Sequence, residues 1–469
     1  MNKLLHLIKK LIPQNLFKKL QPKYHLAFAW LAAFCYRHPS EKLIVIGVTG
    51  TTGKSTSVHL IAKVLESVGY KVGYTSTAMF KVADQEWMNN KKMTMLGRFF
   101  TQRMLSKMVK AGCQYAIIET TSQGIEQFRH RFINYDIVLI TGLYPEHIEA
   151  HGSFAKYKEA KGKLFEHLSA CKTKYINNIK QVQVIKSEIK KIHLERVKKI
   201  IIANADDEQA QYFLNFKADE KVTFQRTGIN VENKKYIISQ RILNKGEIEF
   251  TINDINFKLQ LMGAFNLYNA LTAVSVGLSQ GLSLQQIKTG LENISGVPGR
   301  FERITLTPNP SPAGRRGIDF SVIVDYAYEP NAVTKLYEII ETLPREHIIH
   351  VLGSAGGGRD ISRRPILGKI AGEQADIVII TNEDPYDDDP EIIIAQIAVG
   401  AEKSGKKINE NLFKILDRRE AIKKALRLAK AGDIVLITGK GCEQAICIDG
   451  GKTIPWDDRK VVREELRKL

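Results

Sequence analysis

The chain has 469 residues, 44% of them apolar and 25% charged, which is typical of a globular protein with about two to four domains. Its formal net charge of +19 favours an anionic partner, and charge alone does not choose among a nucleic acid, an anionic membrane face, an anionic substrate and a solvated surface. The five cysteines are scattered with no CxxC pair, which argues against a disulfide framework or a zinc site and favours a reducing cytoplasm.

Residues 1–40 form a basic segment with seven Lys or Arg and no Asp or Glu. Apolar side chains recur at helical spacing from Leu4 to Ile12, and a second apolar run covers Leu26–Phe34. That run is shorter than the ~20 residues of a membrane-spanning helix, and no clear signal-peptide cleavage site follows it. Two interpretations stay open: a basic amphipathic anchor on the anionic inner face of the membrane, and a helical lead-in packed on the first domain.

A glycine-rich loop at Gly47–Thr56 follows the buried-strand pattern of Leu43–Ile46 and precedes an apolar-periodic segment typical of a helix. This order is that of a phosphate-binding loop, whose glycines let backbone N–H groups converge on phosphate oxygens. Lys54 is expected to reach the β- and γ-phosphates, and Ser55 is expected to hold Mg²⁺ through its hydroxyl. The ATP-binding residues predicted here are Gly50, Thr51, Thr52, Gly53, Lys54, Ser55 and Thr56.

Residues 41–297 are predicted to form a central ATP-binding domain of the α/β class, with a mostly parallel sheet covered by helices. The predicted strands are 43–47, 115–119 and 137–141, and the predicted helices are 56–67, 98–111 and 157–168. Strand-like pieces continue at 200–202 and 247–252, and a helix is expected over 261–281.

A linker at 296–299 leads into a second alternating block. The Pro/Gly-rich stretch 307–317 is predicted to be a disordered loop with solvated arginines. Strands are expected at 322–324, 347–352, 377–381 and 434–439, and helices at 332–342, 366–374, 390–399 and 419–429. This alternation predicts a Rossmann-like, doubly wound C-terminal domain over residues 298–469.

Glu119 is a candidate metal ligand outside the loop. It ends a predicted strand beside the loop, and a carboxylate at that position can ligate Mg²⁺, a hard ion that prefers oxygen ligands. A strand-end carboxylate that caps a neighbouring helix is the structural alternative. The adjacent phosphate loop favours the metal role.

Eight stretches in one order resemble a single family. They are 47–56, 119–124, 145–147, 160–161, 263–269, 299–302, 324–327 and 439–441. On these motifs the chain, from about residue 41 to its C-terminus, resembles the Mur ligases, and it is most similar to the branch that adds the third residue of the peptidoglycan stem peptide. The resemblance implies a ligase that uses ATP and Mg²⁺, activates a muramoyl-peptide carboxylate as an acyl phosphate, joins it to an amino acid, and releases ADP and phosphate.

The resemblance implies further residues around the nucleotide. His147 matches a ligand of a second metal ion, and Lys161 matches a lysine that CO₂ converts to a carbamate, an anion that would balance two Mg²⁺ ions. Asn269 matches an asparagine that contacts adenine. Arg300 and Asp325 match residues that reach the nucleotide from the linker and the C-terminal domain when the domains close.

The resemblance also implies residues that bind the substrates. Thr121 and Arg129 stand where the family contacts the muramoyl group. Arg359 lies in a glycine-rich loop near the active site and could steer a phosphate or an amino-acid carboxylate. Glu443 could hold the α-ammonium of the incoming amino acid.

The stretch 382–386 occupies the place where the family reads the incoming amino acid. Members that add meso-diaminopimelate carry an arginine where this chain has Tyr386, and Glu383 and Asp384 make the stretch acidic. A site of this sign is expected to prefer a cationic side chain, so lysine or ornithine would suit it.

The acceptor stays open, because family members carry an N-terminal uridine-binding module that the short stretch before the loop does not match. A related ligase of the folylpolyglutamate, cyanophycin or lipid-linked-precursor type is one alternative. A basic P-loop NTPase that binds nucleic acid is an alternative of another class. No nucleic acid partner is expected, because the sequence shows no RNA-binding aromatic signature or helicase motif set.

Overall fold

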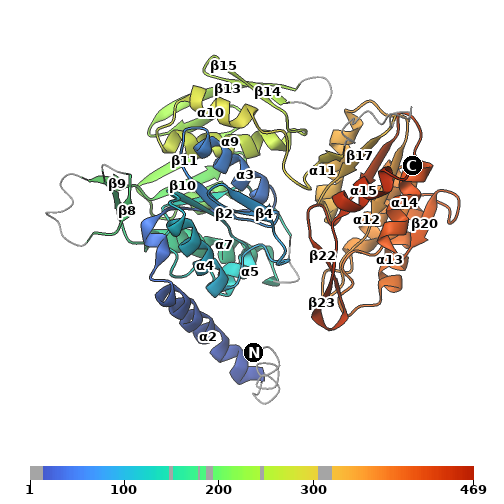
Figure 1. Cartoon of the computed structure of the whole chain (residues 1–469), viewed down its shortest axis with the longest axis horizontal. Helices are drawn as coiled ribbons and strands as arrows, with labels where there is room; N and C mark the ends of the chain where they lie inside the picture. The colour runs from blue at the N-terminus through green and yellow to red at the C-terminus, as the bar shows by residue number, and fades with distance from the viewer. Residues whose placement is uncertain (1–13, 147–150, 178–179, 186–193, 243–247, 305–318) are drawn as a thin grey trace.

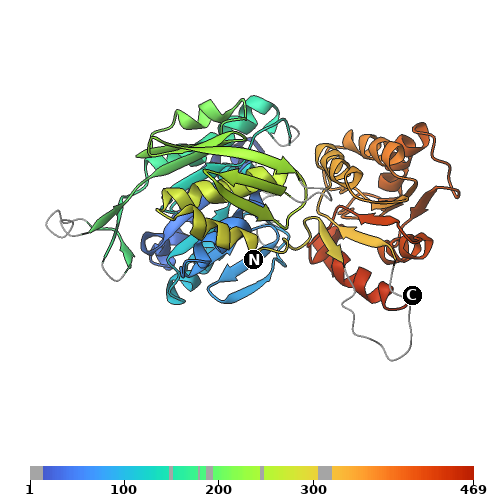
Figure 2. The same ribbon diagram turned by 90° about the horizontal axis from the view of Figure 1, so that it is seen from above.

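The computed structural model describes residues 14–146, 151–177, 180–185, 194–242, 248–304 and 319–469. In this part of the chain two lobes lie side by side, each built on its own large sheet with helices on both faces (Figures 1 and 2). The expectations for His147 and for the stretch 307–317 concern positions outside the described residues. The predicted α/β fold class is confirmed in both lobes.

The first sheet has a parallel centre that carries the phosphate loop. In sheet order its parallel strands are β11 (Glu220–Gln225), β10 (Ile200–Asn204), β6 (Ile137–Ile140), β1 (Ile44–Thr49), β5 (Tyr115–Glu119) and β2 (Val72–Thr75). Successive side chains of β1 enter the hydrophobic cores on opposite faces, Ile44 on one and Val45 on the other. The register sets Glu119 opposite Val48, so its carboxylate lies next to the start of the loop.

Antiparallel strands extend this sheet at both edges, and of these the sequence pattern indicated only the piece at 247–252. They are β3 (Met79–Val82) and β4 (Gln85–Met88) beyond β2, and β12 (Gly228–Val231), β13 (Lys234–Ile242), β14 (Ile248–Ile252) and β15 (Ile255–Leu259) beyond β11. Burial alternates along β14, so one face packs on the core and the other faces solvent. A separate small sheet contains β7 (Lys174–Ile176), β8 (Val182–Gln183) and β9 (Glu195–Val197).

Helices cover the first sheet on both faces. One hydrophobic core includes α3 (Lys54–Glu66), α9 (Phe265–Ser279) and α10 (Leu284–Glu292), and the other includes α4 (Arg98–Lys110), α5 (Ser122–Glu126), α7 (Phe154–Ser169) and α8 (Ala210–Leu214). Helix α2 (Gln14–Cys35) and the short η1 (Pro39–Lys42) precede β1. None of the helices in the described part of the chain has the length and apolar character needed to cross a bilayer.

Helix α9 begins at Phe265 rather than at the predicted position 261. Gly263 adopts a positive φ of 90°, a conformation that favours glycine and lies outside the helix. A Cβ at Gly263 would lie 2.5 Å from Cδ1 of Ile339, which belongs to the second lobe. The absent side chain therefore lets the two lobes approach closely at the start of α9.

The second lobe contains a sheet in the order β16 (Glu302–Ile304), β17 (Ser321–Val324), β21 (Ile434–Ile437), β18 (Ile348–Leu352), β19 (Ile377–Thr381) and β20 (Leu412–Ile415). Only β16 runs antiparallel among these strands. Helices α11 (Pro330–Glu341), α12 (Arg363–Gln374) and α13 (Pro390–Lys403) cover one face, and α14 (Arg418–Leu428) and α15 (Asp458–Leu466) cover the other. A hairpin of β22 (Ala445–Ile448) and β23 (Lys452–Pro455) is attached, with the turn η3 (Asp449–Gly451) between its strands.

A buried ion cluster fixes the start of the parallel strands in the first lobe. The Asp136 carboxylate lies 2.5 Å from Nζ of Lys174 and 2.9 Å from Nζ of Lys199, and it accepts the N–H of Val45 at 2.8 Å. Lys174 also donates to the Leu43 carbonyl at 2.6 Å. Burial lowers the pKa of Lys174 to about 8, against the opposing attraction of Asp136.

We expect Asp136→Asn to lower the free energy of unfolding by about 3–5 kcal/mol, because it leaves two lysine ammonium groups buried without their anion. Urea denaturation at pH 7 measures the change. Glu41→Gln is the matched control: it breaks an ion pair with the exposed Lys172 and should cost less than about 1 kcal/mol. Equal effects of the two variants would contradict the importance of the buried cluster.

Candidate functional site

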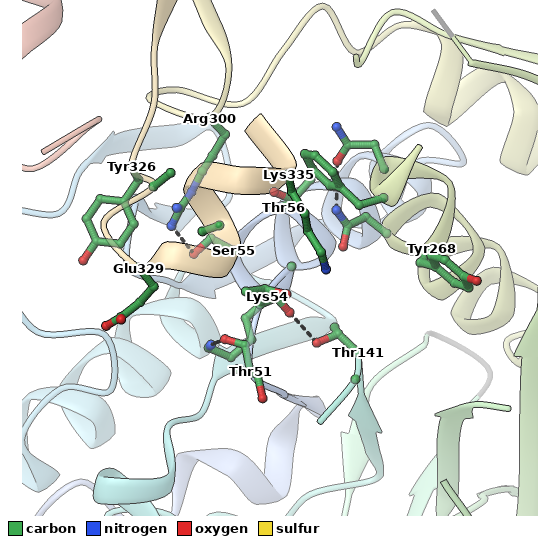
Figure 3. A pocket seen from close by; sticks show the side chains of 18 of the residues that line it. Thr51, Lys54, Ser55, Thr56, Thr141, Tyr268, Arg300, Tyr326, Glu329 and Lys335 are labelled. Atoms are coloured by element: carbon green, nitrogen blue, oxygen red, sulfur yellow. Dashed lines mark hydrogen bonds between the residues drawn. The ribbon is translucent and has the colours of Figure 1, made fainter. Parts of the chain in front are cut away.

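A cavity of about 460 Å³ lies at the carboxyl end of β1 and is lined by both lobes (Figure 3). Loop residues Thr51 to Thr56 form one wall with Glu119. From the other side Arg300, Asp325 and residues of α11 close the cavity. A concave site between two lobes with convergent polar groups is the usual form of a ligand site.

The backbone of the phosphate loop is shaped by close packing against the end of β6. Gly50 has a φ of 146°, and a Cβ there would lie 2.0 Å from Oγ1 of Thr141, so no other residue fits. The Lys54 ammonium folds back over the loop and donates to the carbonyls of Gly50 at 3.1 Å and Thr51 at 2.7 Å. Burial lowers the pKa of Lys54, with Glu119 opposing that shift. A phosphate would offer this ammonium a stronger, charged acceptor than the carbonyls do.

The Glu119 carboxylate is buried and fully engaged beside the loop. It accepts from Oγ of Ser55 at 2.8 Å, and from the N–H and Oγ1 of Thr77 at 2.8 and 2.9 Å. A hydroxyl and a carboxylate held together are hard oxygen donors of the kind that Mg²⁺ takes, so these residues fit the ion. Sequence reasoning missed Thr77, because a threonine after a strand carries no motif.

Mg²⁺ usually takes one or two protein carboxylates and leaves the other positions to water and phosphate. In the described part of the chain, no group of three or more His, Cys, Asp or Glu side chains is placed to hold a metal ion. Ser55 and Glu119 are thus the predicted ligands whose geometry the structure gives, while His147 stays a prediction.

Lys161 lies behind the loop on α7 and is 1% exposed. Its Nζ donates to the Gly50 carbonyl at 2.9 Å and to Oγ1 of Thr49 at 3.4 Å, and it lies 4.7 Å from the ring centre of Tyr157. Burial lowers the pKa of Lys161 well below its usual value, and the neighbouring Lys54 lowers it further. Burial and the neighbouring cation thus both shift the pKa of Lys161 toward the neutral amine, against the attraction of Glu146 and Glu119.

Asn269 lies on α9 against the loop, where it lines the cavity close to Gly53. Its Oδ1 accepts from Oγ of Ser57 at 3.3 Å, and its Nδ2 donates to Oδ1 of Asn266 at 2.8 Å. Tyr268 on the same helix donates to Asp206 at 3.0 Å. Asp206, Asn266, Tyr268 and Asn269 therefore line this part of the cavity with polar side chains.

Arg300 joins the second lobe to the loop. Its guanidinium donates to Oγ of Ser55 at 3.4 Å and lies 4.3 Å from the ring centre of Tyr326 (Figure 3). The neighbouring Asp325 accepts the N–H groups of Phe301 and Ala327, each at 2.6 Å. Burial raises the pKa of Asp325, while Arg300 opposes that shift. Asp325 thus orients the linker, and it also borders the cavity.

A second cavity of about 320 Å³ adjoins the first. The two share lining residues, which are Thr77, Thr94, Thr121, Tyr326 and Tyr328. All six residues predicted to bind substrate line the second cavity: Thr121, Arg129, Arg359, Glu383, Asp384 and Glu443. They come from both lobes, so the structure brings together positions that lie more than three hundred residues apart in the sequence.

Two lysines neutralise the acidic part of this second cavity. Lys92, from the first lobe, lies 2.6 Å from both carboxylate oxygens of Asp384 and 2.9 Å from Oε2 of Glu443. Lys440 contacts the same two carboxylates at 2.9 and 2.6 Å. Two cations therefore already balance Asp384 and Glu443, and the preference of this stretch for a cationic side chain stays a prediction. No motif marked Lys92, because it stands in a polar loop 292 residues from Asp384.

Glu383 differs from the other acids of the cavity. It is 3% exposed, and its Oε2 has no hydrogen-bond partner among the described residues. Burial raises the pKa of Glu383 to about 7, and the charge on Asp384 adds to this shift. Cys442, by contrast, is not activated, since burial raises the pKa of its thiol to about 11.

Comparison with known proteins gives a consistent result. Residues 48–277 match the family model of the Mur ligase middle domain, and residues 299–441 match that of the Mur ligase glutamate ligase domain. A UDP-N-acetylmuramyl-tripeptide synthetase of Roseiflexus sp. (strain RS-1) is 35% identical over 452 residues, covering 96% of this chain and 83% of the relative.

Two further relatives carry diaminopimelate in their names. A UDP-N-acetylmuramoyl-L-alanyl-D-glutamate–2,6-diaminopimelate ligase of Geobacillus thermodenitrificans is 31% identical, with 95% of this chain and 83% of the relative covered. A solved structure of a ligase with that name superposes with a TM-score of 0.54 at 28% identity, covering 91% of this chain and 79% of the other.

The raised pKa of Glu383 predicts a pH-dependent stability. A native pKa near 7 against 4.5 in the unfolded chain means that the folded protein binds the extra proton between these values. This contribution is therefore fully present below about pH 4.5 and is lost as the pH rises through 7. We expect the stability of the natural protein relative to Glu383→Gln to fall by about 3 kcal/mol between pH 4.5 and 8.

Urea denaturation of both proteins across this pH range measures the difference. The glutamine variant keeps the size of the side chain and cannot titrate, so it is the reference. A difference in stability that does not change with pH would contradict a raised pKa for Glu383.

Proposed function

The chain belongs to the Mur ligase family, whose members form amide bonds at the expense of ATP, and from this we propose that it joins a diamino acid to a muramoyl-peptide precursor of peptidoglycan. The observation that carries the proposal is the pair of adjoining cavities. One is lined by the phosphate loop, the other by the residues expected to bind substrate, and they meet at Thr77 and Thr121.

The first chemical step is phosphoryl transfer to a carboxylate. A carboxylate oxygen of the muramoyl peptide attacks the γ-phosphorus of ATP, the bond to the β-phosphate oxygen breaks, and an acyl phosphate and ADP result. Lys54 moves from the carbonyls of Gly50 and Thr51 to the phosphates and stabilises their developing charge. Arg300, already beside Ser55, adds a second cation from the opposite lobe.

Ser55 and Glu119 would hold Mg²⁺, which supplies charge neutralisation at the phosphates when it is bound. Thr77 keeps the Glu119 carboxylate oriented through two hydrogen bonds. Asn269, which lines the cavity from α9, is proposed to contact adenine, and Asp325 is proposed to face the ribose when the lobes close.

The second step is attack of the amine. The α-amino group of the incoming amino acid adds to the acyl carbon, and phosphate leaves from the tetrahedral intermediate as the amide forms. Arg129, Arg359 and Thr121 are proposed to bind the peptide and its carboxylates, since all three line the second cavity. Tyr326 contacts both Arg300 and Glu443 and so links the two cavities.

We propose lysine as the amino acid. Tyr386 supplies no positive charge for a distal carboxylate, whereas the buried Glu383 has an oxygen free to accept from an ammonium group. The relatives named as diaminopimelate ligases support a diamino acid in general. The α-ammonium is proposed to reach Glu443 by displacing Lys92, which holds that carboxylate in this structure.

We also propose that Lys161 is carbamylated. Its deep burial beside a second lysine disfavours the ammonium form, and a neutral amine is the form that adds CO₂. The carbamate would be an anion behind the loop, next to the Gly50 carbonyl that Lys161 contacts in this structure. The nucleic-acid alternative is set aside, because family membership accounts for both lobes.

The function is tested by ADP release from the purified full chain. Acceptors are the UDP-linked, lipid-linked and free muramoyl dipeptides, each combined with lysine, ornithine, meso-diaminopimelate or alanine. We expect ADP release that requires both an acceptor and a diamino acid, with lysine highest. Hydrolysis of ATP that ignores every acceptor and every amino acid would overturn the proposal.

Lys54→Ala should lower kcat by about 10²-fold or more, because it removes the cation that stabilises the transferring phosphoryl group. Lys63→Ala is the matched control on the same helix, since Lys63 forms an ion pair with the nearby Glu66 at 3.5 Å and lies away from the cavity. The control should stay within about twofold of the natural enzyme. An equal loss in both variants would point to damage to the helix rather than to a role in the reaction.

For Lys161 we expect a carbamate signal by ¹³C NMR when the protein is supplied with ¹³C-bicarbonate, and its loss in Lys161→Met. The methionine variant should lose about 10²-fold in kcat, and Lys161→Glu, which keeps a carboxylate, should lose less. A natural protein with full activity and no such signal would exclude the modification.

A further inference from the structure

Helix α2 (Gln14–Cys35) is the most exposed element of the first lobe. Figure 1 shows it extending from the body of the lobe, with its C-terminal part near α4. Three alanines, Ala29, Ala32 and Ala33, are 1% exposed or less and attach it to the lobe, where it packs on α4. Small side chains let the two helices approach closely, so this stripe holds the fully buried residues among the described side chains of α2, with Gln21 and His25 half-buried.

Most of the other large side chains described on α2 are apolar and exposed, with Lys23 as an exposed charged residue among them. Its exposed side chains are Tyr24, Leu26, Phe28, Trp30, Leu31 and Phe34, with Trp30 49% and Phe34 60% exposed. Pairs of them contact each other along the helix: the rings of Tyr24 and Phe28 are 4.4 Å apart and those of Trp30 and Phe34 are 5.5 Å apart. A contiguous exposed apolar patch of this kind marks an interaction surface.

Basic residues are frequent around this outer face among the described residues, and they include Lys23 on α2 itself. Residues 1–40 contain seven Lys or Arg and no acid, and α4 carries Arg103, Lys107 and Lys110 at exposed positions, also without an acid. Phe99 of α4 is 39% exposed and continues the aromatic surface, with its ring 6.4 Å from that of Phe28. Large aromatic side chains combined with lysines and arginines are typical of a surface that contacts an anionic lipid layer.

We propose that the outer face of α2 lies in the headgroup region of an anionic phospholipid leaflet. At 100° per residue the exposed apolar positions span more than half of the helix circumference, and the alanine stripe occupies the remainder. A partner helix would cover only a narrow stripe, whereas a leaflet covers a broad face. A second copy of the chain is disfavoured, because two basic surfaces would repel each other.

This surface serves the proposed function without being required by it. The catalytic cavities lie between the lobes, and none of the α2 side chains lines them. Attachment through α2 would hold the ligase at a membrane while the site between the lobes stays accessible. The inference therefore concerns where the enzyme works and leaves its chemistry unchanged.

The first test is sedimentation of the full chain with phosphatidylglycerol/phosphatidylcholine vesicles and with pure phosphatidylcholine vesicles. We expect binding to the anionic vesicles, weakening as salt is raised. Trp30→Ser with Phe34→Ser should lower this partitioning about tenfold. Ile454→Ser, which removes an apolar side chain 47% exposed in the other lobe, is the matched control and should bind as the natural protein does.

The second test uses tryptophan emission, since the chain has three tryptophans. With Trp87→Phe and Trp456→Phe, Trp30 is the remaining emitter, and anionic vesicles should shift its emission to shorter wavelength. Circular dichroism of every variant checks that it is folded, and ADP release without vesicles checks the catalytic site separately.

Absence of binding to anionic vesicles, or equal binding by the α2 double variant, would overturn the proposal. Light scattering tests the alternative that a second copy of the chain covers α2. If the natural chain is a dimer, the double variant is a monomer and neither binds vesicles, then α2 contacts a second copy. Loss of ADP release with vesicle binding intact would count against the proposed function and not against this surface.

Discussion

The site depends on one constraint: each lobe holds only part of the chemistry, so the two must face each other. The first lobe supplies the phosphate loop and Glu119, and the second supplies Arg300 and Asp325. Polar contacts from Arg300 to Ser55, and from Lys92 to Asp384 and Glu443, join them across the cavities. Because these contacts occupy groups that substrates would need, the arrangement can exchange contacts within the protein for contacts to ligands as the substrates bind.

The lysines around the cavities determine which ligand contacts are favoured in this exchange. Lys161 and Lys440 are buried and Lys54 is half-buried, and taking such a charge out of water costs free energy unless an anion is close. Around Lys440 the protein provides its own carboxylates, whereas the hydrogen bonds of Lys54 to described residues go to two backbone carbonyls. A triphosphate therefore supplies the charge partner that the loop lacks, and the substrate cavity is already close to neutral.

Local patterns in the sequence predicted the parts of the fold that depend on local chemistry. The strand before the phosphate loop and the helix after it begin and end within two residues of the positions predicted from hydrophobic periodicity. The ladder from β11 to β15 was largely missed, because short half-exposed strands resemble loops unless their partners are known. Lys92 and Thr77 were missed for a similar reason: a lysine in a polar loop becomes informative only when folding brings a carboxylate 292 residues away within 2.6 Å.

The buried Asp136 cluster has a consequence for how the chain is made. Asp136 immediately precedes β6, and its two cationic partners, Lys174 and Lys199, come 38 and 63 residues later in the sequence. A growing polypeptide on the ribosome that has released only the first strands therefore holds an acid with no counter-ion in a forming interior. Completion of the first core must wait until the segment through residue 199 has left the exit tunnel, which makes this lobe's assembly late relative to its own sequence.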